Sequence, residues 1–206
     1  MRTHPPADLC TGLAYDYGVR LGKLPSVHPP KARSMESATS GPETTTAITI
    51  RPMAASDVPE LLRLMRAIVS FERGQDFRVD EAELLRRGFG ARPEFGVYVA
   101  DTGAGSLAGM AVHYEIPFMH TLQPLLMLKW LYVDPGWRGS RIGQSLMRRM
   151  AMHARTTGHE RFCWFVLNDN AAAQSFYRGL GATEDPEWRR WIMPSEDLNR
   201  LAEGAE

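Results

Sequence analysis

A mixed α/β fold is predicted by three features of this 206-residue sequence. Short apolar stretches separated by glycine-rich turns fill the first half of the folded part, which is typical of antiparallel strands. A strand, a helix and another strand then follow in direct succession, which is the order of a parallel β-α-β unit. The chain is also long enough to bury one substantial core.

The periodicity of apolar residues predicts each element in chain order. We expect strands at 48–51, 95–100, 107–116, 125–133, 162–167 and 188–193. We expect helices around the apolar stripe 61–69, from Asp80 to about Gly88, from Ile142 to Gly158, from Asn170 to Gly181 and from Ser195 onward.

Capping residues set several of these boundaries. Ser56 or Asp57 can cap the first helix, and Asn170 the fourth. Asp80 and Glu83 have the spacing of a capping box. The run 162–167 is continuously apolar, which predicts a strand covered on both faces.

The first 47 residues differ in composition from the rest. Residues 25–46 are dense in Pro, Ser, Thr and Gly, so they lack the apolar surface that would repay their ordering entropy. We expect a disordered or weakly ordered tail over 1–47 and a folded domain over 48–206. The composition change also makes Met35 a candidate translation start.

Composition limits the partners and the compartment. Lys and Arg number 24 and Asp and Glu 24, so no general attraction to nucleic acid or membrane is expected. No apolar run approaches the roughly 18 residues of a membrane span, and no signal-peptide core is present. Cys10 and Cys163 lie far apart, without disulfide or metal-ligand spacing, which favours a reducing cytoplasm.

The stretch 133–143, V-D-P-G-W-R-G-S-R-I-G, joins a strand to a helix. Unpaired N–H groups and a partial positive charge gather at a helix start, and Arg138 and Arg141 add full charges. This combination predicts a site for a phosphate or pyrophosphate. The alternative is an ordinary connection that carries two arginines.

R-G-S-R-I-G resembles the R/Q-x-x-G-x-G/A loop of the GNAT superfamily of acetyl-CoA-dependent N-acetyltransferases. A second stretch, 168–182, is similar to the family's N-x-x-A-x-x-x-Y-x-x-x-G segment. L-Y-V-D-P-G-W-R-G and the ending W-R-R-W-I-M-P-S-E-D-L-N-R-L-A are most like the spermidine/spermine branch. The resemblance covers about 48–201. It implies a mostly antiparallel sheet with one splayed parallel pair, helices on both faces, and in that branch a common homodimer.

The resemblance also implies a binding site for acetyl-CoA as co-substrate. Its residues would be Leu131, Tyr132, Val133, Arg138, Gly139, Ser140, Arg141, Ile142, Gly143, Asn170 and Tyr177. The main chain near Leu131 and Val133 would align the pantetheine and polarise the thioester carbonyl. Arg141 replaces a family glycine, and its side chain would crowd the diphosphate if the backbone there adopts a positive φ.

By the same resemblance, Tyr177 is the acid that protonates the departing thiolate. Taken by itself, Tyr177 would more readily be a core aromatic residue beside Phe176, and the two motifs together favour the chemical role. Asn170 could be a helix cap only, although both of its roles are compatible.

Lys129 and Trp130 stand where polyamine acetyltransferases have an acidic pair: L-K-W-L-Y-V here, L-E-D-L-Y-V there. Lys129 would repel a polyamine and attract a carboxylate. We therefore expect as substrate a small primary amine that is less cationic than spermidine. The alternatives are a solvated strand end for Lys129 and a core position for Trp130.

The expected general base is then missing. Glu115 is the best replacement carboxylate, with His113 and His120 behind it, and ordered water is the alternative. Arg141 and the lost acidic pair also leave open a rival function, an acetyl-CoA-binding module without turnover, although the retained Tyr177 argues against it. A further rival is a protein acetyltransferase, for which no motif here indicates a peptide groove.

Overall fold

The computed structural model describes residues 47–72, 77–117 and 122–204. Residues 47–182 belong to one compact unit, and 183–204 lie outside it and are considered separately. Most of the predicted tail, with Cys10 and Met35, falls outside the described residues, as does His120. The division into a tail over 1–47 and a domain over 48–206 therefore stays a prediction. None of the helices in the described parts of the chain has the length and apolar character needed to cross a membrane.

The compact unit contains one sheet with the strand order β1-β2-β3-β4-β5. The strands are β1 (Thr49–Pro52), β2 (Gly96–Asp101), β3 (Leu107–Ile116), β4 (Leu125–Val133) and β5 (Arg161–Trp164). Neighbours from β1 to β4 are antiparallel, and β4 and β5 are parallel. The predicted mixed, mostly antiparallel sheet with one parallel pair is confirmed.

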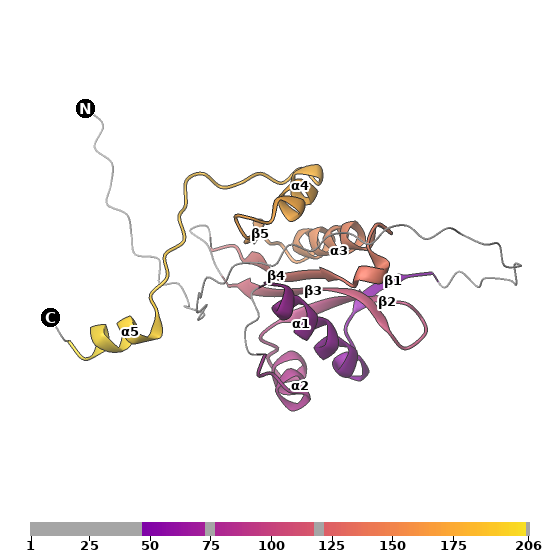
Figure 1. Ribbon diagram of the computed structural model, residues 1–206, viewed down its shortest axis with the longest axis horizontal. Helices are drawn as coiled ribbons and strands as arrows, with labels where there is room; N and C mark the ends of the chain where they lie inside the picture. The colour runs from indigo at the N-terminus through magenta and orange to yellow at the C-terminus, as the bar shows by residue number, and fades with distance from the viewer. Residues whose placement is uncertain (1–46, 73–76, 118–121, 205–206) are drawn as a thin grey trace, which may run out of the picture. The chain divides into compact units, whose positions relative to one another are not determined.

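Helices cover both faces of this sheet (Figure 1). They are α1 (Val58–Glu72), α2 (Glu81–Phe89), α3 (Ile142–Thr156) and α4 (Ala171–Gly179). The α1-side core packs α1 and α2 against one face and includes Leu61, Leu64, Val99 and Met110. The α3-side core packs α3 against the other and includes Leu126, Leu146 and Met150. Full burial of each such side chain is worth about 1.5–3 kcal/mol, so the two layers fix the sheet between them.

Several predicted caps are confirmed. The Asp80 carboxylate accepts a hydrogen bond from the Glu83 amide at 2.8 Å, and the Asn170 side chain accepts one from the Ala173 amide at 3.0 Å. Gly158 follows α3 with a φ of 76°, the left-handed geometry that glycine adopts most readily. Asp57 instead accepts hydrogen bonds from the Ala54 amide and the Arg51 guanidinium, so it ties the start of α1 to β1.

A bulge interrupts the pairing of β3 with β4. Val112 lies opposite Trp130 and His113 opposite Leu128, so Lys129 is the extra residue on β4. Leu128 and Leu131 pack on the α3-side core, while Trp130 packs on the α1-side core. The bulge thus decides which face each later side chain of β4 occupies.

The prediction for β5 was wrong in length and in coverage. The strand ends at Trp164 rather than near Leu167, and it forms the edge of the sheet. Phe165, just after it, is 67% exposed. A continuous apolar run shows that residues can be buried on two faces, but burial also requires a further neighbour, which the described sheet does not supply.

The strand predicted over 188–193 was also wrong. These residues have no strand pairing in the described structure, and the Trp191 side chain is 91% exposed. Alternating apolar and basic residues favour an extended backbone, but a strand also needs a partner. The helix predicted from Ser195 is confirmed as α5 (Ser195–Ala202).

Candidate active site

The phosphate loop predicted over 133–143 connects β4 to α3 through a short 3-10 turn, η2 (Pro135–Trp137). Two of its residues have left-handed backbone conformations, Gly139 with a φ of 83° and Arg141 with a φ of 62°. Where right-handed and left-handed backbone conformations alternate, successive N–H groups point toward one place, which is the geometry of an anion-binding nest. Arg141 directly precedes α3, and its guanidinium has donors but no acceptor, so the residue at the cap position leaves the first-turn amides open.

Short tethers hold this loop against β4. The Arg138 Nε donates to the Val133 carbonyl at 3.2 Å, and the Ser140 hydroxyl donates to the Trp137 carbonyl. Arg138 and Arg141 are both exposed. The start of α3 therefore combines convergent amides with two cationic side chains, which suits a phosphate or diphosphate.

Close packing brings the second motif to the same place. A β-carbon on Gly143 would lie 3.5 Å from the Phe176 ring, so the start of α3 contacts α4. A β-carbon on Gly109 would lie 2.7 Å from the Tyr132 carbonyl oxygen and 3.4 Å from Ile142. Only glycine at position 109 allows β3, β4 and the start of α3 to approach so closely.

Tyr177 lies on α4 and packs against the α3-side core, to which Leu131, Val133 and Ile142 also belong. Its ring centroid is 4.9 Å from that of Trp164 and 5.2 Å from that of Phe176. Tyr177 is half-buried rather than sealed in the core. The geometry therefore supports its packing against aromatic neighbours and still leaves room for a chemical role.

Beside Tyr177 the two parallel strands separate. β5 pairs with β4 only from Leu125 to Leu128, opposite Arg161 to Trp164. β4 then continues to Val133 without a partner on that side. The main-chain N–H and C=O groups that point to the β5 side past Leu128 can therefore pair with an extended ligand, except the Val133 carbonyl, which accepts from Arg138.

Lys129 and Trp130 lie at the bulge, where this separation begins. The Lys129 ammonium nitrogen is 5.4 Å from the Trp130 ring centroid, within the range of a cation–π contact. Trp130 packs on the α1-side core, which was the alternative expected for it, but its Nε1 is buried and has no hydrogen-bond partner among the described residues. A buried donor of this kind favours a ligand that offers an acceptor.

Glu115 lies away from the gap where β4 and β5 separate, which is called the opening below. It is opposite Leu126 near the end of β3, and β4 lies between β3 and β5. Its Oε1 is 3.5 Å from the His153 Nε2 and 3.6 Å from the His159 Nε2. The sequence analysis missed both histidines, which a search for imidazoles spaced along α3 and its following turn would have raised as candidates.

His113 stands next to this group. Its ring centroid is 4.9 Å from that of His153. Burial, together with the nearby charge of His153, lowers the pKa of His113 to about 4. The His113 imidazole is therefore neutral near pH 7.

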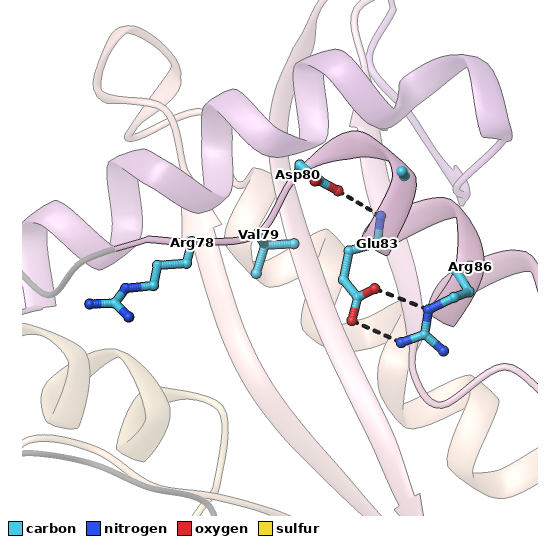
Figure 2. Close-up of a pocket in the computed structure, with 6 residues that line it drawn as sticks. Arg78, Val79, Asp80, Glu83 and Arg86 are labelled. Atoms are coloured by element: carbon cyan, nitrogen blue, oxygen red, sulfur yellow. Dashed lines mark hydrogen bonds and ion pairs between the residues drawn. The ribbon is translucent and has the colours of Figure 1, made fainter.

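A separate open depression lies at the start of α2, lined by Arg78, Val79, Asp80, Ala82, Glu83 and Arg86 (Figure 2). Figure 2 shows the Glu83 carboxylate directed at Arg86, with contacts of 2.8 and 3.0 Å. Hydrogen bonds from Arg86 and Arg87 lower the pKa of Glu83 to about 2. Glu83 is thus a poor proton acceptor at neutral pH. The depression shares a helix start and arginines with the loop, but here the Asp80 carboxylate already accepts from the first-turn amide of Glu83.

Comparison with known proteins identifies the family. The profile of the Acetyltransferase (GNAT) family matches residues 61–182, from α1 to just past α4. The chain belongs to the acetyltransferase (GNAT) family. The predicted resemblance is therefore confirmed, and with it the class of enzyme, an N-acetyltransferase. GNAT enzymes generally use acetyl-CoA as the acetyl donor.

Two curated GNAT relatives illustrate the match. Mouse thialysine N-epsilon-acetyltransferase is 30% identical over 164 residues, which is 74% of this chain and 96% of the mouse protein. Human spermidine/spermine N(1)-acetyltransferase-like protein 1 is 30% identical over 163 residues, 74% of this chain but only 23% of that protein. Both agree with the predicted spermidine/spermine branch of the GNAT enzymes.

Solved structures support the GNAT fold. An integron cassette protein from V. cholerae superposes with a TM-score of 0.64 at 23% identity, covering 75% of this chain and 97% of its own. A metagenomic aminoglycoside acetyltransferase superposes with a TM-score of 0.61 at 22% identity, covering 71% and 95%. At such identities these likenesses concern the fold alone.

Proposed function

We propose that this GNAT enzyme transfers the acetyl group of acetyl-CoA to a primary amine of a small molecule that also carries a carboxylate. The proposal rests on one observation. Between the bulge at Lys129 and the phosphate loop, β4 is no longer paired with β5, and Tyr177 lies beside this gap. The opening offers free main-chain groups, a phenol and a cation within one stretch of the sheet.

The co-substrate would lie along this opening. Amides of residues 138–143 would hold the pyrophosphate, and the Arg138 side chain would add a charge-assisted contact. Arg141 has the positive φ at which its side chain is expected to crowd the diphosphate, so its charge would act together with that crowding. The free edge of β4 at Leu131, Tyr132 and Val133 would align the pantetheine, and Asn170 would lie at its far wall. An N–H near Leu131 would polarise the thioester carbonyl, as oxyanion donors do.

The reaction requires two proton movements. The free amine attacks the carbonyl carbon, so a C–N bond forms and the C–S bond breaks. The departing thiolate takes a proton from the Tyr177 hydroxyl, and the nitrogen loses one. An alkylammonium has a pKa near 10.4, so a base must remove its first proton before attack.

Ordered water is the better candidate for that base. Glu115 was the carboxylate predicted for this role, but it lies on β3, with β4 between it and the opening. It also faces two histidines rather than Tyr177. A chain of water molecules in the opening would carry the proton to solvent.

Lys129 and the unpartnered N–H of Trp130 suit a carboxylate on the acceptor. A cation and a neutral donor at one place bind an anionic group better than an ammonium. The mouse relative is named for the N-epsilon position of thialysine, an amino acid that has both an amine and a carboxylate. The carboxylate of such an acceptor would be attracted by the positive charge of Lys129.

Steady-state thiol release with an amine panel tests the proposal. We expect thialysine and lysine to be acetylated with a kcat/KM at least about 10-fold above that of spermidine, since the acceptor site carries a cation. The decarboxylated counterparts of both amino acids are the matched controls, because they keep the amine and lose the carboxylate. Equal rates with spermidine, or no loss on decarboxylation, would refute the assigned substrate class.

The strained Arg141 in the loop favours one rival function, an acetyl-CoA-binding module without turnover. Calorimetry separates the two. Binding of coenzyme A with no thiol release for any amine supports the rival, and absence of binding contradicts both. Protein acetylation has no comparable observation in its favour.

The compartment, the oligomeric state and the domain limits belong to the same proposal. We infer a cytoplasmic enzyme from the two separated cysteines, of which Cys163 forms no disulfide in the described part of the chain. A homodimer is inferred from the branch, and light scattering on the purified chain tests it. Limited proteolysis tests the tail over 1–47 and the domain over 48–206.

A further inference from the structure

The side chains of Glu115, His153 and His159 converge outside the proposed active site. They come from β3, from α3 and from the turn that follows α3. No two of their ligand atoms are more than 4.8 Å apart. These three residues are called the His–Glu cluster below.

The distances in the His–Glu cluster suit a metal ion better than direct hydrogen bonds. The Glu115 Oε1 lies 3.5 Å from the His153 Nε2 and 3.6 Å from the His159 Nε2. Hydrogen bonds between nitrogen and oxygen are shorter, at about 2.7–3.2 Å. Neighbouring ligands of a tetrahedral zinc ion, with bonds of about 2.1 Å, are about 3.4 Å apart.

A hydrogen-bond chain sets the tautomer of His159. The Thr157 hydroxyl has one hydrogen, which it donates to the His153 carbonyl at 2.7 Å. The same hydroxyl is 2.6 Å from the His159 Nδ1, so both contacts are hydrogen bonds at once when this nitrogen is the donor. In the neutral imidazole the Nε2 then carries a lone pair, and that lone pair faces the Glu115 carboxylate.

Two lone pairs directed at one another repel unless a cation lies between them. The His159 side chain is only 1% exposed, and its Nε2 is buried without a hydrogen-bond partner. The His153 Nε2 is buried in the same way. A bound cation would satisfy both nitrogens and the carboxylate oxygen at once.

Outer contacts of the kind that support metal ligands are also present. A metal-bound imidazole usually donates its second N–H to an oxygen atom, which fixes its orientation. Here the His159 Nδ1 contacts Thr157, and the His153 Nδ1 is 3.1 Å from the Tyr98 hydroxyl. The guanidinium of Arg149 lies 4.9 Å from the Tyr98 ring centroid, which helps to hold that phenol in place.

We propose that Glu115, His153 and His159 bind one divalent transition-metal ion, Zn²⁺ before others, which joins the end of β3 to the end of α3. Two imidazoles and one carboxylate form a common zinc ligand set. Glu115 is 51% exposed, so ions can enter and water can complete the tetrahedron. No metal ligands were predicted from the sequence, so this site differs from that prediction. The site does not depend on the proposed acetyl transfer.

Zinc titration of the full chain tests the site. The protein is purified without a histidine tag, stripped with a chelator and titrated with Zn²⁺ in a calorimeter, with melting temperature followed in parallel. We expect saturable binding of one ion and a rise in melting temperature, because the ion binds only the folded cluster. Glu115→Gln and His159→Gln should each weaken the affinity by at least about 10-fold.

Matched controls exclude binding elsewhere. Glu81→Gln changes an exposed carboxylate on α2, and His28→Gln changes an imidazole outside the described residues; both should keep the wild-type affinity. Should His159→Gln fail to fold, the exposed Glu115→Gln still tests the cluster. With Co²⁺, the wild type should give the visible absorption of a tetrahedral ion, and Glu115→Gln should lose it.

Two results would overturn the site. One is a wild-type chain without saturable Zn²⁺ binding, which would mean that the two histidines and Glu115 contact only one another. The other is unchanged affinity in both Glu115→Gln and His159→Gln.

Discussion

The two ends of α3 carry different kinds of chemistry. At its start, main-chain N–H groups and a left-handed Arg141 would form the proposed acetyl-CoA site, which one continuous stretch of sequence supplies. Near its end, about 16 Å along the axis, His153 joins a carboxylate from β3 and an imidazole from the next turn. The first site depends on backbone conformation and the second on side chains from three elements.

This difference predicts that the two ends can be disabled separately. Variants at the start should change catalysis or acetyl-CoA binding and leave metal affinity intact. Variants at the end should change metal affinity and stability.

The largest effect is expected for Tyr177→Phe. Loss of the phenol proton removes the acid for the departing thiolate, so kcat should fall about 10-fold or more. Calorimetry should still find wild-type affinities for acetyl-CoA and Zn²⁺, and the melting temperature should stay within a few degrees. Unchanged kcat would remove Tyr177 from the mechanism, and lost Zn²⁺ affinity would show that the two ends of α3 are coupled.

Reversing the charge at the bulge should change the acceptor preference. Lys129→Glu replaces attraction of a carboxylate by attraction of a cation, so the ratio of kcat/KM for spermidine to that for thialysine should rise by roughly 10-fold or more. Lys129→Gln is the matched control, and it should lie between the two. A ratio that stays constant across all three proteins would mean that Lys129 does not face the acceptor.

Tyr98→Phe is the counterpart of Tyr177→Phe at the other end of α3. It removes the hydroxyl beside the His153 Nδ1, an outer contact whose loss typically weakens metal binding about 10-fold. Titration with Zn²⁺ measures this effect directly. Wild-type affinity in Tyr98→Phe, together with weaker binding in Glu115→Gln, would restrict the site to its three direct ligands.

The smallest effect is expected for Arg141→Gly. A left-handed backbone costs a residue with a β-carbon about 1 kcal/mol, so glycine should raise the unfolding free energy by about that amount and the melting temperature by about 2–4 °C. Arg141→Ala keeps the strain and removes the charge, which separates the two contributions. A stability gain in the alanine variant alone would contradict the strain argument.

Local patterns explain what the sequence could predict. The limits of β3 and β4, the caps Asp80 and Asn170, and the loop before α3 all depend on residues close together in the chain. The GNAT motifs are equally local. Even the positive φ at Arg141 could be anticipated, because the family has glycine there.

Long-range arrangements explain what it could not. β5 is shorter and more exposed than predicted, because burial depends on which strands are its neighbours. The residues 188–193 have strand-like composition but no partner. The convergence of Glu115 with His153 and His159 requires the register of β3, the length of α3 and the path of the next turn, none of which the individual residues specify.

The bulge at Lys129 also affects how this active site can diversify. Since β4 has one residue too many for its register, the side chains on either side of position 129 reach their cores whatever occupies it. A shortened chain lacking that residue would keep Leu128, Trp130 and Leu131 on their present faces. Position 129 is therefore largely released from packing constraints, and evolution can vary its charge to suit new acceptors without rebuilding the sheet.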